Sequence, residues 1–378
     1  MSKFEDIRPY IDEEVPGVLE GLIQNDEFLD IILKSELPKL NNLAPKIAKA
    51  TAKTKLKKKL KNINTIDDFQ QEIRVFFNKL IERTETSLSH SGLNDASNDH
   101  AHLFMSNHRD IAMDPGFIGY LLYGSKHGTV EIAIGDNLLK KDFASDLMRL
   151  NKSFIVKRSV KGREKLFALK ELSEYIHDAV ENKRNVWIAQ REGRAKNSID
   201  KTDPTILKMF HIAKKKDGTL KDAINALHII PVSISYEYDP CAIMKAEELY
   251  AIDTDGSFEK DEETDLKSIA QGINGHKGNV HLSFGNEITS ETDDPEAIAK
   301  QIDERIVLNY KLHASNYIAY EILRESNSEL PKIESFETEI TESKRAEFME
   351  LYNEVKDHLK PYFLNIYANP VIHKNEFK

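Results

Sequence analysis

The sequence predicts an α/β protein in which a largely parallel, mixed sheet is flanked by helices, with further helices at both ends of the chain. The main observation is that short apolar runs of strand length alternate with amphipathic segments between residues 103 and 284. A second observation is the helical periodicity of residues 1–86 and again of residues 343–362. Strands that alternate with helices are typical of a sheet covered on both faces. We therefore divide the chain into a helical N-terminal domain (1–94), an α/β domain (95–326) and a C-terminal helical segment (327–378).

The composition is that of an ordinary globular protein, with 378 residues of which 31% are charged and 40% hydrophobic. A formal net charge of −10 argues against nucleic acid as the main partner. The single cysteine, Cys241, excludes an intrachain disulfide and fits a reducing compartment. The N-terminus lacks an apolar core, and no uncharged apolar run approaches the roughly 20 residues that span a bilayer. We expect a cytoplasmic protein, for which any contact with the inner face of the membrane is peripheral.

The N-terminal region has apolar residues at helical spacing in residues 15–37 and in a second helix that opens at Thr65. Asp68 follows Thr65 by three positions, which is a variant of the capping box. Between these helices, the segment from Lys46 to Lys61 carries eight lysines and no acid. This basic segment could contact anionic lipid headgroups or an acidic carrier protein, and a solvated helix face without a partner is the third interpretation.

The elements of the sheet follow a polar, turn-rich segment, residues 87–100, which we interpret as a linker. Strands are predicted at residues 103–105, 129–134, 153–156, 186–189, 228–234 and 279–284, the last as an edge strand. Helices are predicted beyond Pro115, over residues 164–183 with Leu166 on the buried face, and after Pro295. The acidic stretch 253–277 is predicted to be an exposed loop.

The first strand of the sheet breaks into a polar turn before the apolar helix beyond Pro115. This break places His108 and Asp114 at a strand-to-helix corner, where an α/β sheet usually keeps its ligand crevice. Histidine is the side chain best suited to take a proton near neutral pH, and a nearby carboxylate can hold its tautomer and stabilise the imidazolium. The alternative is structural: His108 caps a turn, and Asp114 only starts a helix.

Basic side chains follow two further strands, at the ends that should share one edge of the sheet. They are Lys157 and Arg158 after residues 153–156, and Arg194 and Lys196 after residues 186–189. Arginine forks and lysine point charges bind phosphate groups, so their coincidence beside a histidine favours an anionic substrate. Each of them alone would more often be an ordinary surface charge.

Other common kinds of site find no support in the sequence. No glycine-rich phosphate loop implies a nucleotide cofactor, and the GxSxG pattern of a serine nucleophile is absent. The 13 histidines show no paired ligand spacing, and His100-Ala101-His102 before a strand is a weak metal signal. We therefore assign no metal, no cofactor and no role for Cys241.

Four ordered blocks resemble the glycerophospholipid acyltransferase family, in particular its soluble chloroplast-type and bacterial glycerol-3-phosphate acyltransferases. The blocks are SNHRDIAMDP (106–115), FIVKRS (154–159), VWIAQREGRAKN (186–197) and IIPVSISYE (229–237). The family has four residues between its histidine and its aspartate, whereas five separate His108 from Asp114, and Asp110 is the rival partner. The family's third block reads Glu-Gly-x-Arg. Glu192-Gly193-Arg194 is one residue shorter, and we favour Arg194 over Glu192 as the residue that keeps its role.

The resemblance implies transfer of a fatty acyl group from a thioester, acyl-CoA or acyl carrier protein, to a hydroxyl of glycerol 3-phosphate in phosphatidic acid synthesis. His108 would be the general base and Asp114 would orient its ring. The acceptor's phosphate would be held by Lys157, Arg158, Arg194 and Lys196. Lysophosphatidate is the alternative acceptor, and a non-catalytic lipid- or acyl-binding protein on the same fold is the alternative of another class. An acidic carrier protein as donor would provide a partner for the basic segment.

Overall fold

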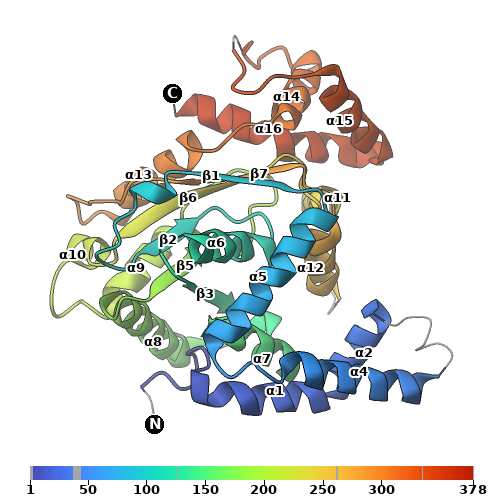
Figure 1. Ribbon diagram of the computed structural model, residues 1–378. Coiled ribbons are helices and arrows are strands. Elements are labelled where there is room, and N and C mark those ends of the chain that lie inside the picture. Colours follow the sequence, from blue (N-terminus) through green and yellow to red (C-terminus); the bar gives the residue numbers. More distant parts are fainter. Residues whose placement is uncertain (1–2, 37–43, 126, 261–262, 334, 378) are drawn as a thin grey trace. The chain divides into compact units, whose positions relative to one another are not determined.

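The computed structural model describes residues 3–36, 44–125, 127–260, 263–333 and 335–377. The chain forms two compact units, and each is built from two separate stretches of sequence. Unit 1 contains Met1–Phe77 and Glu131–Ala168, and unit 2 contains Asn78–Val130 and Leu169–Lys378. Figure 1 labels most of the helices and strands of both units. Among the described residues, no helix combines the length and apolar character needed to cross a membrane.

The strands of unit 2 lie in the order β1-β7-β6-β2-β5. They are β1 (Ser87–Ser91), β2 (Leu103–Ser106), β5 (Asn185–Ala189), β6 (Ile229–Tyr236) and β7 (Asn279–Phe284). Only the β6–β7 pair is antiparallel, and the other neighbours are parallel. Every residue of β2 and β6 is buried, as expected for central strands that are covered on both faces. The predicted class, a largely parallel mixed sheet flanked by helices, is confirmed.

The outer edge of this sheet differs from the prediction. Ser87–Ser91, which we interpreted as part of a linker, forms β1 and pairs in parallel with β7, so β7 is not an edge strand. The hydroxyls of Ser89 and Ser91 lie 2.8 and 3.1 Å from the two ring nitrogens of His281. Backbone pairing and polar contacts thus stabilise this strand. Because it needs no buried apolar face, its sequence lacks the alternating apolar pattern by which a strand is predicted.

Helices of unit 2 cover the sheet and extend beyond it. They are α6 (Met113–Gly124), α9 (Pro204–Ile212), α10 (Leu220–Asn225), α11 (Ala242–Asp255), α12 (Thr264–Asn274), α13 (Pro295–Leu308), α14 (Ala314–Ser326), α15 (Glu342–Glu354) and α16 (Lys360–Glu376). Helix α12 corrects the prediction of an exposed loop at residues 253–277, because Ser268 and Gly272 form a buried face beneath its charged residues. Asp261 and Glu262, in the same acidic stretch, lie outside the described residues.

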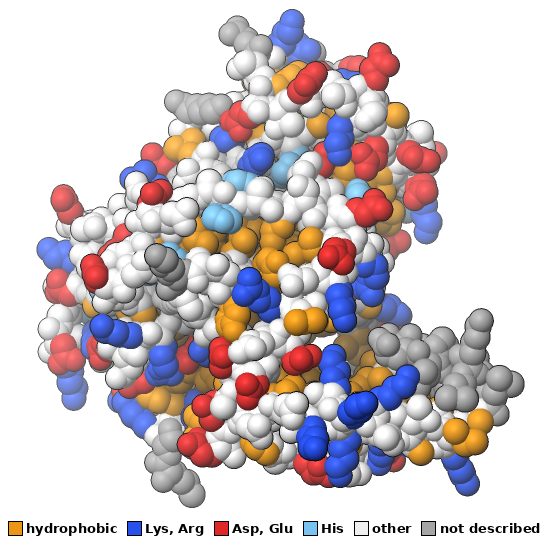
Figure 2. Space-filling view, viewed as in Figure 1, with side chains coloured by type: hydrophobic (Ala, Val, Ile, Leu, Met, Phe, Trp, Pro, Cys, Tyr) orange, Lys and Arg blue, Asp and Glu red, His pale blue; other side chains and the backbone are white. Residues whose placement is uncertain are grey.

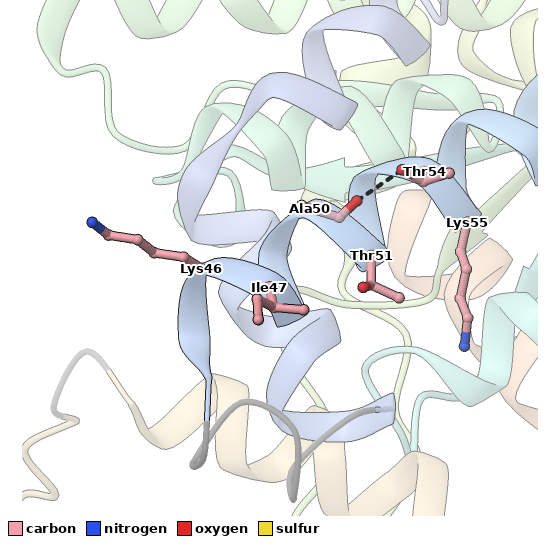
Figure 3. Close-up of a pocket in the computed structure, with 6 residues that line it drawn as sticks. All are labelled: Lys46, Ile47, Ala50, Thr51, Thr54 and Lys55. Atoms are coloured by element: carbon pink, nitrogen blue, oxygen red, sulfur yellow. Dashed lines mark hydrogen bonds between the residues drawn. The ribbon is translucent and has the colours of Figure 1, made fainter.

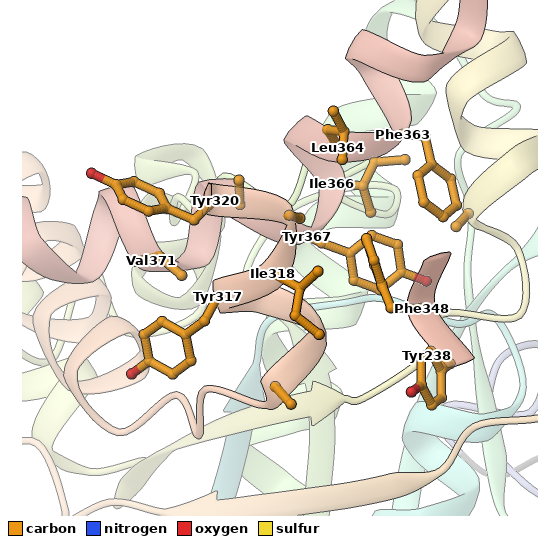
Figure 4. Close-up of a cluster of buried hydrophobic side chains, with 14 of the residues drawn as sticks. Tyr238, Tyr317, Ile318, Tyr320, Phe348, Phe363, Leu364, Ile366, Tyr367 and Val371 are labelled. Carbon is orange, nitrogen blue, oxygen red and sulfur yellow. The ribbon is translucent and has the colours of Figure 1, made fainter. Parts of the chain in front are cut away.

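Helices α14, α15 and α16 gather at the C-terminal end of unit 2, in orange and red in Figure 1. They enclose a cluster of buried aromatic and aliphatic side chains, shown in Figure 4. Tyr317 and Tyr320 come from α14, Phe348 comes from α15, and Phe363 and Tyr367 come from α16. The ring centroids of Phe363 and Tyr367 are 5.1 Å apart, a distance typical of favourable aromatic pairs. The segment predicted as one helix at 343–362 is therefore divided between α15 and α16.

Unit 1 is mainly helical, with one parallel pair of strands. Its elements are α1 (Val15–Gln24), α2 (Asp26–Glu36), α4 (Pro45–Leu60), the larger part of α5 (Ile66–Arg83), β3 (Val130–Gly135), α7 (Asp142–Leu150) and β4 (Ser153–Val156). The helix predicted at 15–37 breaks at Asn25, whose side chain accepts the Phe28 N–H at 2.9 Å, and Leu37 lies outside the described residues. The predicted capping box is confirmed: Asp68 N–H donates to Thr65 Oγ1 at 3.1 Å, and Thr65 N–H donates to Asp68 Oδ2 at 3.0 Å.

Helix α8 (Gly162–Glu181) begins in unit 1 and ends in unit 2. Its later turns bury Leu172, Ile176 and Val180. Leu166, which we placed on the same buried face, is 65% exposed. The apolar periodicity continues along the whole helix, but residues 162–167 are all exposed. The apolar stripe is therefore longer than the part of the helix that is buried. Short 3₁₀ turns lie at Asp12–Glu14, Leu93–Asp95, Asp136–Leu138 and Asp357–Leu359.

Candidate active site

The turn that carries His108 is fixed by the side chain of Asn107, at the end of β2. Ile234 N–H of β6 donates to Asn107 Oδ1 at 2.7 Å, and Asn107 Nδ2 donates to the Ile234 carbonyl at 3.0 Å. The side chain therefore continues the β2–β6 ladder by one step while the backbone turns away from the sheet. Asp110 closes the turn, because its Oδ1 accepts the N–H groups of Ala112 and Met113 at 2.9 and 2.8 Å at the start of α6.

His108 Nδ1 lies 2.8 Å from Asp114 Oδ2. The same oxygen accepts the N–H groups of Arg109 and Asp110 at 2.5 and 2.9 Å, and Asp114 Oδ1 accepts the Tyr236 hydroxyl at 2.7 Å. The Asp114 side chain is fully buried, whereas the His108 side chain keeps 14% of its surface exposed. Asp114, and not Asp110, therefore contacts His108, because helical side chains lean towards the N-terminus of their helix and those in the first turn of α6 face the preceding turn.

The electrostatics of the two neighbouring aspartates differ. Burial alone would raise the pKa of Asp114, but the hydrogen bond and charge of His108, together with the Asp110 N–H and the Tyr236 hydroxyl, outweigh it and lower this pKa. Burial, followed by the charge of Asp114, raises the pKa of Asp110. The ionised partner is therefore Asp114. A carboxylate at Nδ1 assigns the imidazole proton to that nitrogen and leaves Nε2 able to accept a proton.

A buried ion pair supports the backbone beside His108. Arg109 donates two hydrogen bonds to the Asp200 carboxylate, at 2.8 and 2.6 Å, and both side chains are almost fully buried. Lys245 of α11 donates to the Arg109 carbonyl at 2.7 Å and also binds Asp239. Tyr367 of α16 accepts the Asp239 N–H at 3.0 Å. These contacts were not predicted, because no spacing in the sequence relates Arg109 to its partners.

Two of the four predicted phosphate ligands lie in the loop after β5. Its backbone is joined to the histidine turn, since Ala195 N–H donates to the His108 carbonyl at 3.2 Å. Arg194 donates to Ser268 Oγ of α12 at 2.7 Å, and Lys196 donates to both oxygens of Glu248 on α11 at 2.7 and 2.6 Å. Burial, together with the Arg194 charge and against the hydrogen bond to Glu248, lowers the pKa of Lys196 to about 8.

The other two predicted ligands, Lys157 and Arg158, belong to unit 1 and follow β4. Lys157 Nζ lies 3.6 Å from an Asp6 carboxylate oxygen. The backbone N–H of Arg158 donates to Asp136 Oδ1 at 3.1 Å. Their participation in a site with His108 stays a prediction. Glu192, the rival of Arg194, is exposed.

Residues 87–235 match the family model described as Acyltransferase. No curated protein matches the chain. Among solved structures, the chain resembles the 1-acyl-sn-glycerophosphate (LPA) acyltransferase PlsC from Thermotoga maritima, with 15% sequence identity and a TM-score of 0.39. The likeness covers 64% of this chain and 78% of that one.

Proposed function

We propose that the protein moves a fatty acyl group from a thioester to a hydroxyl of glycerol 3-phosphate, because residues 87–235 match the family model described as Acyltransferase. The donor would be acyl-CoA or acyl carrier protein. The observation that supports this proposal best is the 2.8 Å contact between His108 Nδ1 and the buried Asp114 carboxylate, which leaves Nε2 as the proton acceptor. General-base catalysis of this kind typically contributes about 10²–10⁴ in rate.

The proposed reaction needs no covalent acyl-enzyme. His108 Nε2 takes the proton of the acceptor hydroxyl as its oxygen bonds to the thioester carbonyl carbon. The carbon–sulfur bond then breaks, and the imidazolium returns the proton to the leaving thiolate. Asp114 keeps the ring oriented and stabilises the imidazolium between these two steps, as the ionised carboxylate does in other histidine–aspartate pairs. The products are an ester and a free thiol.

Arg194 and Lys196 are the proposed ligands of the acceptor's phosphate. Both belong to the loop whose Ala195 N–H binds the histidine turn, so their position relative to His108 is fixed by backbone. Glu248, which binds Lys196, also lies 3.8 Å from Lys260 Nζ, and the charge of Arg194 acts on Lys196. One acid therefore accompanies three cations, and this excess of positive charge favours an anionic acceptor. We keep Lys157 and Arg158 in the proposal on the strength of the block FIVKRS.

The proposal is tested by measuring transfer from a radiolabelled acyl thioester to glycerol 3-phosphate and, separately, to lysophosphatidate. We expect product with glycerol 3-phosphate, and at least a hundredfold lower kcat for His108→Ala. Exclusive activity on lysophosphatidate would correct the acceptor and keep the mechanism. Absence of transfer to both acceptors, or full activity of His108→Ala, would refute the proposed function.

We also propose that α4 attaches the protein to the cytoplasmic face of an anionic membrane. Figure 2 shows basic side chains gathered over α4, and Figure 3 shows a hollow lined by one face of this helix. Within that hollow, the apolar side chain of Ile47 is 63% exposed between lysines. An apolar side chain flanked by lysines suits a peripheral helix at a lipid surface.

Vesicle co-sedimentation tests this attachment, with phosphatidylglycerol-containing vesicles at low and high salt. We expect binding at low salt that is lost at high salt and weakened when Lys57, Lys58 and Lys59 are changed to glutamine. The matched control is the same change in a second run of three lysines, residues 214–216 of unit 2. Binding that ignores salt, or that falls equally in both variants, would contradict the role of α4.

A further inference from the structure

Three histidines and one glutamate meet in unit 2, at the end of β2 opposite to His108. His100 and His102 directly precede β2, His228 directly precedes β6, and Glu287 follows β7. Because β6 is parallel to β2 and antiparallel to β7, these three points of the chain lie at one edge of the sheet. None of these four residues takes part in the candidate active site.

The donor atoms of this cluster have the spacing of metal ligands. One donor atom each from His100, His102 and Glu287 lies within 4.8 Å of the other two. His100 Nε2 is 3.2 Å, and His102 Nδ1 is 4.0 Å, from the same carboxylate oxygen of Glu287. Two ligands of a tetrahedral zinc ion are separated by about 3.3 Å, given metal–ligand distances near 2.0–2.1 Å. Only small side-chain rotations are therefore needed to bring the three atoms onto one ion.

The hydrogen bonds of His102 leave one of its nitrogens in need of a positive partner. Nε2 lies 3.0 Å from the Ser97 carbonyl, and Nδ1 lies 3.2 Å from the His228 carbonyl. A neutral imidazole carries a single N–H, so it can donate to only one of these two oxygens. When Nε2–H donates to Ser97, the lone pair of Nδ1 faces the carbonyl oxygen and Glu287. A cation at Nδ1 satisfies all three acceptors.

The frame around these side chains is held by backbone hydrogen bonds. Ile288 N–H donates to the Ile229 carbonyl at 2.8 Å beside Glu287, and Leu103 N–H donates to the Leu227 carbonyl at 3.1 Å beside His102. Sites built on such fixed segments hold their ligands in place.

His228 supports Glu287 from outside the three donor atoms. Its Nδ1 lies 2.7 Å from the second oxygen of Glu287, and its ring stacks on that of His100 with centroids 3.8 Å apart. His228 has a φ of +47°, a strained conformation that glycine would adopt more easily. A ligating carboxylate is commonly oriented by such an outer hydrogen-bond partner.

We propose that His100, His102 and Glu287 bind a zinc ion, with His228 orienting the carboxylate. Nitrogen ligands from two imidazoles and one carboxylate oxygen are the donor set that zinc prefers over calcium or magnesium. The sequence pair His100-Ala101-His102 alone was a weak signal, because its partners are more than 120 residues away in the chain. The ion would link the segment before β2 to the segment after β7. The site lies at the opposite end of β2 from His108, so the ion would take no part in the proposed acyl transfer.

The test is calorimetric titration of the full-length chain, freed of metal with a chelator, with zinc chloride alone. We expect one ion per chain with a Kd of about a micromolar or tighter, and a higher thermal unfolding midpoint with zinc present. His100→Ala and Glu287→Gln should each weaken binding by at least tenfold. Both side chains are about one-third exposed, so these changes leave the core intact.

The matched control is His276→Ala, because His276 Nε2 also lies 3.2 Å from a glutamate oxygen, that of Glu347. Among the described residues, no third possible ligand forms a metal-binding group with these two. Its zinc affinity should equal that of the wild type. Absence of stoichiometric binding, or equal affinity of the wild type and both site variants, would overturn the proposal. An equal loss in His276→Ala would overturn it as well.

Discussion

Replacing Asp114 by asparagine separates the two tasks that the proposed mechanism gives to this carboxylate, namely holding the His108 ring and stabilising its positive charge. The Oδ2 position accepts three donors, from His108, Arg109 and Asp110, whereas Oδ1 accepts only the Tyr236 hydroxyl. The amide oxygen of asparagine must take the Oδ2 position, because an NH₂ group there would face two backbone N–H groups. The Tyr236 hydroxyl can rotate and accept from the amide. The ring and its tautomer are therefore retained, and only the charge is lost.

The expected magnitude follows from the kind of hydrogen bond that remains. A hydrogen bond to a charged group is worth about 1.5–3 kcal/mol and a neutral one about 0.5–1.5 kcal/mol, so the imidazolium loses about 1–2 kcal/mol of stabilisation. At about 1.4 kcal/mol for each factor of ten, kcat should fall roughly 5- to 30-fold. An asparagine that imposed the wrong tautomer would instead cost about 10⁴.

The assay is transfer from the radiolabelled thioester under saturating acceptor, with the thermal unfolding midpoint measured in parallel. Asp110→Asn is the matched control, because Asp110 caps α6 through Ala112 and Met113 and asparagine caps a helix about as well as aspartate. We expect its kcat to stay within about threefold of the wild type. An unchanged kcat in Asp114→Asn, or an equal fall in Asp110→Asn, would refute the role of Asp114.

Three further predictions use groups around this pair. Burial lowers the pKa of Lys196 to about 8, so this side chain loses its positive charge as the pH rises through that value, and kcat/KM for glycerol 3-phosphate should fall over the same range. Lys196→Arg should remove this fall, and a fall that persists in the variant would contradict phosphate binding by Lys196. Arg109→Leu should cost about 3–5 kcal/mol in urea unfolding, because it leaves the Asp200 carboxylate buried and unpaired; a loss below about 1 kcal/mol would show that this pair is not buried as described. In Gly272→Ala, the added Cβ would lie 2.0 Å from Asp110 Oδ2, so overpacking should destabilise the protein by about 1–3 kcal/mol and lower its unfolding midpoint. An unchanged midpoint would contradict the contact between α12 and the turn.

Much of the sheet could be predicted from the sequence, because its central strands are continuous apolar runs and its polar breaks are sharp. The run Leu103-Phe104-Met105 and its break at Ser106 identified both β2 and the turn that carries His108. The capping pair Thr65 and Asp68 could be recognised for the same reason, since the contact is local. Strand β1 could not, because its polar residues show no burial pattern, and α12 could not, because its charges conceal a buried face of small residues.

The choice between Asp110 and Asp114 was open in the sequence for a specific physical reason. Spacing alone does not say where a helix starts, and one residue more or less before α6 turns a carboxylate by about 100° around the helix axis. Asp110 caps the helix with its own side chain, so α6 starts at Met113 and Asp114 faces the turn. Asp110 thus determines where α6 starts, and this start determines the direction of the Asp114 side chain.

The surroundings of the pair explain why the residues that support it are distant in the chain. Asp114 is buried and ionised, and the pKa of the neighbouring Asp110 is raised. This arrangement requires a rigid turn, because movement of the backbone would let water or a proton replace the contact with His108. The backbone oxygens of such a turn cannot all be satisfied within it. The Arg109 carbonyl is bound instead by Lys245, which Asp239 holds and Tyr367 of α16 supports in turn. The aromatic cluster of the C-terminal helices, which contains Tyr367, therefore supports the histidine turn through three polar contacts, although Tyr367 and Arg109 lie 258 positions apart in the sequence.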